Sequence, residues 1–240
     1  KMLGVTCEPF GKDHAAAGGS YDTGKLIAKK IFDYEPPEPL PYEWISLKGE
    51  SMSSSKGRVF TLKQWLEVAM PELLRYFIFR SKALKAKDFD PGFPLVELYQ
   101  EYQQLEDVYY GREEPKESRK EQMNRIYEFS QTDEVFEEYP QRIPFRLATV
   151  LVQVTKDYSH AMDILDKKGV LKDPNDQEIE LAEKRLERAE NWIEKYAPDN
   201  AKVKILDRLP NDQKEQLSDK QKECLFSLSE DLSEKDYEPV

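Results

Sequence analysis

Short apolar runs and one amphipathic segment alternate along the first sixty residues of the chain. Residues 2–10 form an apolar run of strand length, residues 22–32 have the spacing of a helix, and residues 42–47 form a second apolar run. Four prolines between residues 36 and 41 predict a stiff connection, because proline fixes φ and has no amide hydrogen to give to a strand ladder. Two strands joined by a helix favour a parallel β–α–β unit, with the first strand buried.

Beyond this unit the apolar positions take up helical spacing. Thr61 and Gln64 are spaced as in a capping box, and Pro71 suits the first turn of a following helix. The clearest stripe runs through residues 176–196, where apolar positions repeat at alternating intervals of 3 and 4. We therefore predict an all-α assembly over residues 61–240, and a fold that is mostly α overall.

Two polar loops follow the predicted strands. Gly11 to His14 comes after the first strand, and the stretch GESMSSSKG, residues 49–57, comes after the second. The carboxyl ends of parallel strands share one edge of a sheet and ligands bind beyond that edge, so we expect both loops to lie there. A stretch rich in Gly and Ser is also typical of a plain solvated connection, so its neighbours must decide between the two interpretations.

Composition removes several classes of protein. The 240 residues suffice to bury a core, and no apolar run approaches the roughly 20 residues of a membrane span. No signal peptide is visible from Lys1 onward, so we expect a cytoplasmic protein without a membrane partner. Cys7 and Cys224 fit no metal spacing and are expected to be reduced thiols. His14 and His160 are too few for a His-rich site, so we predict no bound metal.

Charge is unevenly distributed along the chain. The net charge of −11 argues against indiscriminate nucleic-acid binding, and DNA is not an expected partner. Residues 1–60 carry eight basic and eight acidic side chains, so the acidic excess lies in the remainder. Residues 73–87 run against that excess, because they contain no acid but include Arg75, Arg80, Lys82, Lys85 and Lys87. Such a run is usually a solvated helix face, and it is also the pattern expected of contacts to a phosphate backbone.

Four segments carry a family resemblance: FGKDHAAAGGSYDTGKLIAKKIF, YEWISLKG, SMSSSKG and PELLRYFIFRSK. In this order they resemble the class I lysyl-tRNA synthetases, chiefly those of archaea. The resemblance implies that residues 1–60 form the C-terminal half of a Rossmann catalytic domain, residues 61–115 a stem-contact helical domain, and residues 116–240 an α-helical anticodon-binding region. It also implies lysine–tRNA ligase activity, with lysine, ATP with Mg²⁺ and tRNA(Lys) as the partners.

SMSSSKG occupies the place of the KMSKS signature loop of class I synthetases. Ser51 and Ser54 stand where that signature has its two lysines, and Lys56 is the nearest cation. The resemblance implies that this loop closes over the triphosphate of ATP, with catalytic roles for Lys56, Ser53 and Ser55. Gly18 and Gly19 are expected at ATP as room for close backbone approach, with a helix start as the competing interpretation. The loop residues expected to bind ATP are Met52, Ser54 and Lys56.

The family uses the loop after the first strand for the amino acid and its adenylate. This implies lysine-binding roles for His14 and Asp13, although a structural histidine and a helix-capping aspartate are the competing interpretations. Tyr42 and Trp44 fall on one face of the predicted second strand, where they would form an aromatic wall for an ammonium group or simply pack.

The cationic residues between 73 and 87 adjoin PELLRYF, which resembles the start of the family's stem-contact segment. The resemblance therefore implies that Arg75, Arg80, Lys82, Lys85 and Lys87 face the acceptor side of tRNA. The sequence does not identify residues that read the anticodon.

The HIGH signature, which binds ATP in this class of synthetases, does not occur in the sequence. We therefore predict that the 240-residue chain alone gives ATP–pyrophosphate exchange at background level, and exchange above the buffer control would contradict this. The absent signature also favours an alternative function, a non-catalytic tRNA-binding module derived from such a synthetase. A helical interaction protein is disfavoured by the β–α–β start.

Overall fold

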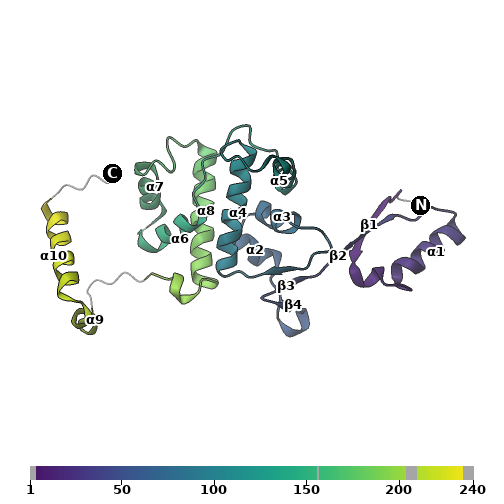
Figure 1. The fold of residues 1–240 in the computed structure, drawn as a ribbon, viewed down its shortest axis with the longest axis horizontal. Coiled ribbons are helices and arrows are strands. Elements are labelled where there is room, and N and C mark those ends of the chain that lie inside the picture. The colour runs from purple at the N-terminus through teal and green to yellow at the C-terminus, as the bar shows by residue number, and fades with distance from the viewer. Residues whose placement is uncertain (1–3, 156, 204–209, 235–240) are drawn as a thin grey trace. The chain divides into compact units, whose positions relative to one another are not determined.

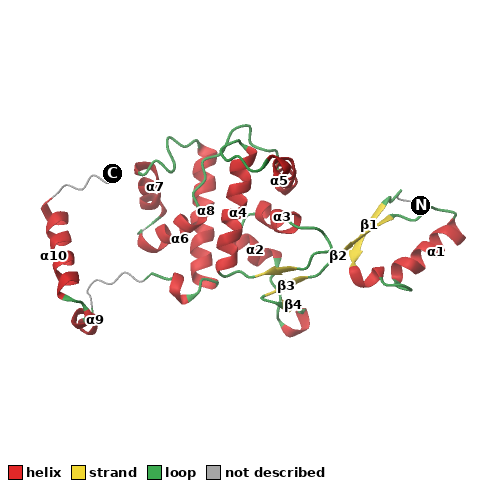
Figure 2. Ribbon diagram, viewed as in Figure 1, coloured by secondary structure: helices red, strands yellow, loops and turns green. Residues whose placement is uncertain are grey.

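The computed structural model describes residues 4–155, 157–203 and 210–234. The chain divides into two compact units, one made of residues 1–140 with 194–197, and one made of residues 141–193 with 198–240. Helices dominate both units, and among the described residues the strands lie only in the first unit (Figures 1 and 2). The prediction of a mostly α fold with a β–α–β start is confirmed.

The β–α–β unit consists of β1 (Cys7–Gly11), α1 (Ser20–Phe32) and β2 (Glu38–Tyr42). The strands pair in parallel from Cys7↔Glu38 to Gly11↔Tyr42. The prediction that the proline segment is only a connection is wrong, because β2 contains Pro39 and Pro41. Glu38 donates its amide to the Thr6 carbonyl at 2.8 Å, and amides alternate in direction along a strand, so the two prolines occupy positions facing away from β1.

A second sheet has the order β4–β3–β5, from β4 (Glu50–Ser51), β3 (Ile45–Leu47) and β5 (Lys87–Phe89). Strand β3 pairs antiparallel with β4 and parallel with β5. Three predictions are therefore wrong. Residues 42–47 are not one strand, because Tyr42 is the last residue of β2 and Trp44 lies in the connection that leads from β2 to β3. Residues 61–240 are not all α, and the two polar loops leave different sheets rather than a common edge.

Four helices complete the first unit: α2 (Leu62–Val68), α3 (Pro71–Phe79), α4 (Phe93–Tyr109) and α5 (Glu117–Ser130). The capping box of Thr61 and Gln64 begins α2, and Pro71 is the first residue of α3, as predicted. Trp65 is only 3% exposed, and its indole donates to the Met70 carbonyl at 3.1 Å. Its ring lies 4.8 Å from that of Phe89 in β5, so the hydrophobic core reaches the second sheet.

The second unit contains α6 (Phe145–Val154), α7 (Tyr158–Lys167), α8 (Asp176–Lys195), α9 (Asn211–Gln216) and α10 (Asp219–Glu234). The predicted stripe on α8 is confirmed as core, since Ala182, Leu186 and Ala189 are buried. Trp192 extends it, with its ring 6.2 Å from that of Phe145. Within the described ranges no helix is both long and apolar enough to span a bilayer.

Burial differs sharply within the first unit. No described residue from 4 to 64 is buried, and Trp65 is the first residue of the hydrophobic core along the chain. The expectation that the first strand is buried is wrong, because Cys7, Glu8 and Pro9 are exposed. Residues 2 and 3 of the predicted strand lie outside the described residues. Helix α1 covers one face of a two-stranded sheet, and this leaves Ile31 at 70% exposure.

Candidate nucleotide and amino-acid sites

The carboxyl ends of β1 and β2 bring two predicted segments together. Strand register places Gly11 beside Tyr42, and a 3-10 turn over Lys12–Ala15 follows Gly11. Lys12 Nζ lies 2.6 Å from Glu43 Oε2, and the Trp44 amide donates to Glu43 Oε1 at 2.9 Å. These two hydrogen bonds, that from Lys12 first, lower the pKa of the Glu43 carboxyl below its ordinary value. Sequence reasoning missed both Lys12 and Glu43, because their pairing depends on the strand register.

His14 lies at a cavity between the first sheet and α1. Its Nδ1 is 2.8 Å from Ser20 Oγ, at the first residue of α1. The cavity has a volume of about 370 Å³, and its walls include Glu8, Tyr21 and Lys25. A carboxylate, an ammonium and an imidazole thus border one space, which suits a small zwitterionic or phosphorylated ligand.

The other predicted lysine-binding residues lie outside that cavity. Asp13 is exposed, and its backbone carbonyl rather than its side chain accepts a hydrogen bond, from the Ala16 amide. Helix α1 begins at Gly19 as its cap, so the alternative role of Asp13 as the cap of this helix is not found. Tyr42 is 46% exposed and Trp44 is 59% exposed. Both aromatic side chains therefore have free surface near the edge where β2 ends.

The glycine pair has a structural reason of its own. Gly18 has φ of 77°, in the left-handed region that favours glycine. A Cβ on Gly19 would stand 2.7 Å from the carbonyl oxygens of His14 and Ala16, so only glycine fits there. Asp22 accepts a hydrogen bond from the Gly18 amide at 3.2 Å, and this bond is the main reason that the pKa of Asp22 is lowered.

The serine loop extends from a β-hairpin. Lys48 and Gly49 both have positive φ, 52° and 77°, and connect β3 to β4 as a two-residue turn of the type that matches strand twist. After β4, Ser53 and Arg58 form an isolated antiparallel bridge, and the side chains of Glu50 and Arg58 form an ion pair. The loop is therefore closed at its base.

The tip of the serine loop is a 3-10 turn over Ser54–Lys56. Ser53 Oγ lies 3.2 Å from Ser55 Oγ, and Gly57 has φ of 67°, which reverses the chain. Lys56 is exposed and has no ion-pair partner among the residues that the structure describes. The tip thus presents hydroxyl groups, backbone amides and one uncompensated ammonium group, which are the donors that a polyphosphate requires.

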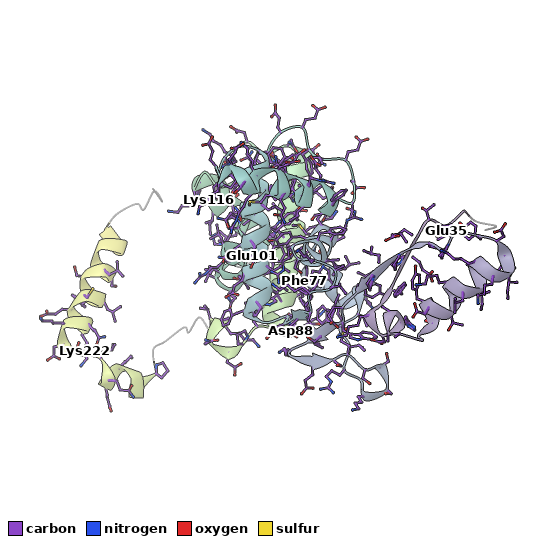
Figure 3. The ribbon with its side chains drawn as sticks, turned by 45° about the vertical axis from the view of Figure 1, so that its right-hand side comes forward. Glu35, Phe77, Asp88, Glu101, Lys116 and Lys222 are labelled. Carbon is purple, nitrogen blue, oxygen red and sulfur yellow. The ribbon has the colours of Figure 1, made fainter. Side chains whose placement is uncertain are left out.

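Asp88 in β5 fixes the hairpin from a distant part of the sequence (Figure 3). Its Oδ1 accepts hydrogen bonds from Ser46 Oγ at 2.6 Å and from the Gly49 amide at 2.7 Å. Lys48 Nζ lies 3.6 Å from Asp90 Oδ1. Lys48 is thus already engaged by a carboxylate, unlike Lys56. Sequence reasoning missed Asp88 because nothing local to it indicates a strand.

The predicted cationic residues do not form one helix face. Arg80 pairs with Glu101 on α4 at 2.6 Å, and Arg75 Nε donates to the Phe129 carbonyl at 2.9 Å. Lys87 Nζ donates to two carbonyls of the turn before β5, each at 3.2 Å, and burial is the main cause of its lowered pKa. Lys82 and Lys85, in that turn, are exposed and lack an ion-pair partner among the described residues.

No group of three or more His, Cys, Asp or Glu side chains that could hold a metal ion occurs in the described parts of the chain.

Comparison with known proteins identifies the family. The family described as tRNA synthetases class I (K) matches residues 1–133. A curated lysine–tRNA ligase of Methanopyrus kandleri is 41% identical over 94% of this chain and 41% of its own length. Those of Methanocaldococcus jannaschii and Methanosphaera stadtmanae are 40% and 37% identical, over 100% and 99% of this chain. The chain covers only 47% and 46% of these two relatives, so it spans about half their length.

The family match includes both loops described above, Gly11–His14 and residues 49–57, and the cationic turn before β5. It covers more than half of the chain and agrees with the resemblance drawn from the four motif segments. The chain belongs to the class I (K) tRNA synthetases.

Proposed function

We propose that this chain forms the part of a lysine–tRNA ligase that carries the KMSKS-like loop and the tRNA-binding helices. The substrates are lysine, ATP with Mg²⁺ and tRNA(Lys), and the reaction takes place in the cytoplasm with the rest of translation. The N-terminal β–α–β unit then serves as the second half of a Rossmann catalytic fold. Curated relatives named as lysine–tRNA ligases support this assignment, at about 40% identity over nearly the whole chain.

The serine loop is the observation that carries the proposal. Adenylation of lysine transfers the adenylyl group of ATP to the lysine carboxylate: the carboxylate attacks the α-phosphorus and pyrophosphate leaves, so negative charge grows on the leaving group. The loop tip offers Ser53, Ser54 and Ser55 hydroxyls and backbone amides, and Lys56 supplies a flexible positive charge. Donors placed where charge develops lower the barrier more than they strengthen substrate binding. Met52, at 39% exposure, would pack against the nucleotide.

The lysine substrate is assigned to the edge where β1 and β2 end. His14 and Asp13 approach it from the loop after β1, and Tyr42 and Trp44 from the end of β2. The exposed aromatic faces suit the ammonium group of a lysine side chain. Gly18 and Gly19 would leave room for protein backbone groups near this loop to contact ATP.

A chimera provides the direct test of this proposal. The chain replaces the matching segment of the Methanocaldococcus jannaschii relative, which aligns with all of it. We expect lysine-dependent ATP–pyrophosphate exchange, measured with tRNA(Lys) present, well above the isolated chain. A chimera that unfolds cooperatively and binds tRNA(Lys), but shows no exchange, would instead support the non-catalytic tRNA-binding module.

The cationic residues Arg75, Arg80, Lys82, Lys85 and Lys87 are assigned to contacts with the acceptor side of tRNA. Lys82 and Lys85, in the turn before β5, give the cleanest test of this assignment. Replacing both Lys82 and Lys85 by glutamine should weaken tRNA binding and flatten the dependence of log K on log[salt] by roughly one unit per lost phosphate contact. These two side chains have no ion-pair partner among the described residues, so the double substitution breaks no ion pair.

Lys63→Gln is the matched control for that measurement, because Lys63 is an exposed lysine on α2 outside the cationic run. It should leave both affinity and salt dependence unchanged. If the Lys82/Lys85 double variant behaves like this control, the run is a solvated surface and the assignment is wrong.

A further inference from the structure

Two half-exposed phenyl rings meet where α3 and α5 pack together. Phe79 is the last residue of α3 and is 43% exposed, and Phe129 lies in the last turn of α5 at 53% exposure. Their centroids are 6.1 Å apart, with the ring planes inclined at 51°. The neighbouring aromatic residues Tyr76 and Tyr127 are buried, so this pair stands at the outer end of the aromatic core.

An arginine guanidinium group lies over each of these two phenyl rings. The Arg75 guanidinium carbon lies 5.8 Å from the Phe79 centroid, and that of Arg125 lies 5.6 Å from the Phe129 centroid. Arg75 Nε also donates to the Phe129 carbonyl, which links the middle of α3 to the last turn of α5. A guanidinium has five N–H donors, so Arg75 keeps further donors available while it makes this bond.

The rings and Arg125 border an open cleft of about 390 Å³. Ile126 adds apolar surface, Ser118 and Gln122 add hydrogen-bonding groups, and Glu121 is the one carboxylate among the cleft residues. Among the cleft residues Arg125 balances Glu121, and Arg75, which lies over the Phe79 ring, adds a second guanidinium group beside the cleft. This combination suits a ligand that is flat, apolar on its faces and anionic at its edge.

We propose that this cleft binds an unstacked nucleotide of single-stranded RNA. The base stacks on Phe79 or Phe129, and Arg75 and Arg125 turn from the ring faces to the flanking phosphates. Exposed aromatic rings that alternate with arginines are the usual means by which proteins hold single-stranded RNA. This inference rests on the proposed function, in which RNA is a substrate, but it assigns a site beyond the cationic turn and beyond the catalytic loops.

Binding of a short single-stranded RNA to the 240-residue chain tests the site. The probe is a fluorescent 12-nucleotide RNA without self-complementarity, and anisotropy gives its affinity at fixed salt. We expect Phe79→Ala and Phe129→Ala each to weaken binding by about 10-fold, the scale of losing one stacking partner. Arg125→Gln should weaken binding and reduce its salt dependence. A duplex of the same sequence should be insensitive to the phenylalanine substitutions.

Phe226→Ala is the matched control, since Phe226 is a 68% exposed phenylalanine on α10. It should bind the probe as the unsubstituted chain does, and all variants should keep their melting temperature. Unchanged probe binding by both Phe79→Ala and Phe129→Ala, with tRNA(Lys) still bound by the chain, would overturn the site and leave the proposed function intact. Failure of the unsubstituted chain to bind either the probe or tRNA(Lys) would overturn both.

Discussion

Replacing Lys56 by alanine is expected to slow lysine adenylation in the chimera by about 10²-fold, the loss typical of one preorganised donor to a developing charge. Lys56 is the cation at the tip of the serine loop, and no described residue pairs with it. Because the interaction forms mainly in the transition state, kcat and kcat/KM should fall together while KM for ATP changes little. Steady-state ATP–pyrophosphate exchange gives these constants, and pre-steady-state measurement of adenylate formation gives the rate constant of the adenylation step itself.

Lys48→Ala is the control for that experiment, because Lys48 is the other lysine at the same hairpin. Its ammonium group lies 3.6 Å from Asp90, and its backbone occupies the turn between β3 and β4. Its replacement should change the rate by much less than that of Lys56. A normal rate for Lys56→Ala beside a crippled Lys48→Ala would move the catalytic charge to Lys48.

Replacing Trp65 by alanine is expected to destabilise the first unit by about 3–5 kcal/mol, the range for removing a large buried aromatic side chain. Trp65 is 3% exposed and packs against Phe60, Phe77 and Phe89, so the surrounding rings cannot close the cavity. Thermal unfolding should show a fall of about 10 °C in the midpoint of this unit.

Leu66→Ala serves as the control for Trp65, since Leu66 is the next residue on α2 and is 42% exposed. It should cost less than about 1 kcal/mol. Equal shifts for the two variants would mean that the aromatic cluster is not the core of this unit. Because Phe89 follows Asp88 in β5, Trp65→Ala should also loosen the hairpin and so weaken catalysis in the chimera.

The helices were predictable because their signals are local. The Thr61–Gln64 box and Pro71 each mark a helix start within four residues of sequence, and the apolar stripe of α8 repeats over its whole length. Strands β2 and β5 lack such signals. Prolines in β2 are tolerated only because the strand has one partner, and β5 is a strand only because β3 lies beside it.

The residues of the candidate sites were likewise predictable only where their sequence signals are local. The serine loop and the Gly11–His14 loop were proposed as sites from sequence, because motif spacing within one segment carries the information. Glu43 and Asp88 were missed, because Glu43 gains its role from Lys12, and Asp88 from a turn 39 residues earlier. Interactions of that kind depend on the strand register, which no local pattern specifies.

Transfer of lysine to tRNA(Lys) is the decisive assay for the proposed ligase function. Radiolabelled lysine, ATP with Mg²⁺ and a tRNA(Lys) transcript are incubated with the chimera that carries this chain in place of the matching segment of its Methanocaldococcus jannaschii relative. The account predicts that lysine becomes esterified to tRNA(Lys), that other amino acids do not, and that Lys56→Ala removes most of the rate. A folded chimera that binds tRNA(Lys) but never charges it with lysine would contradict the account.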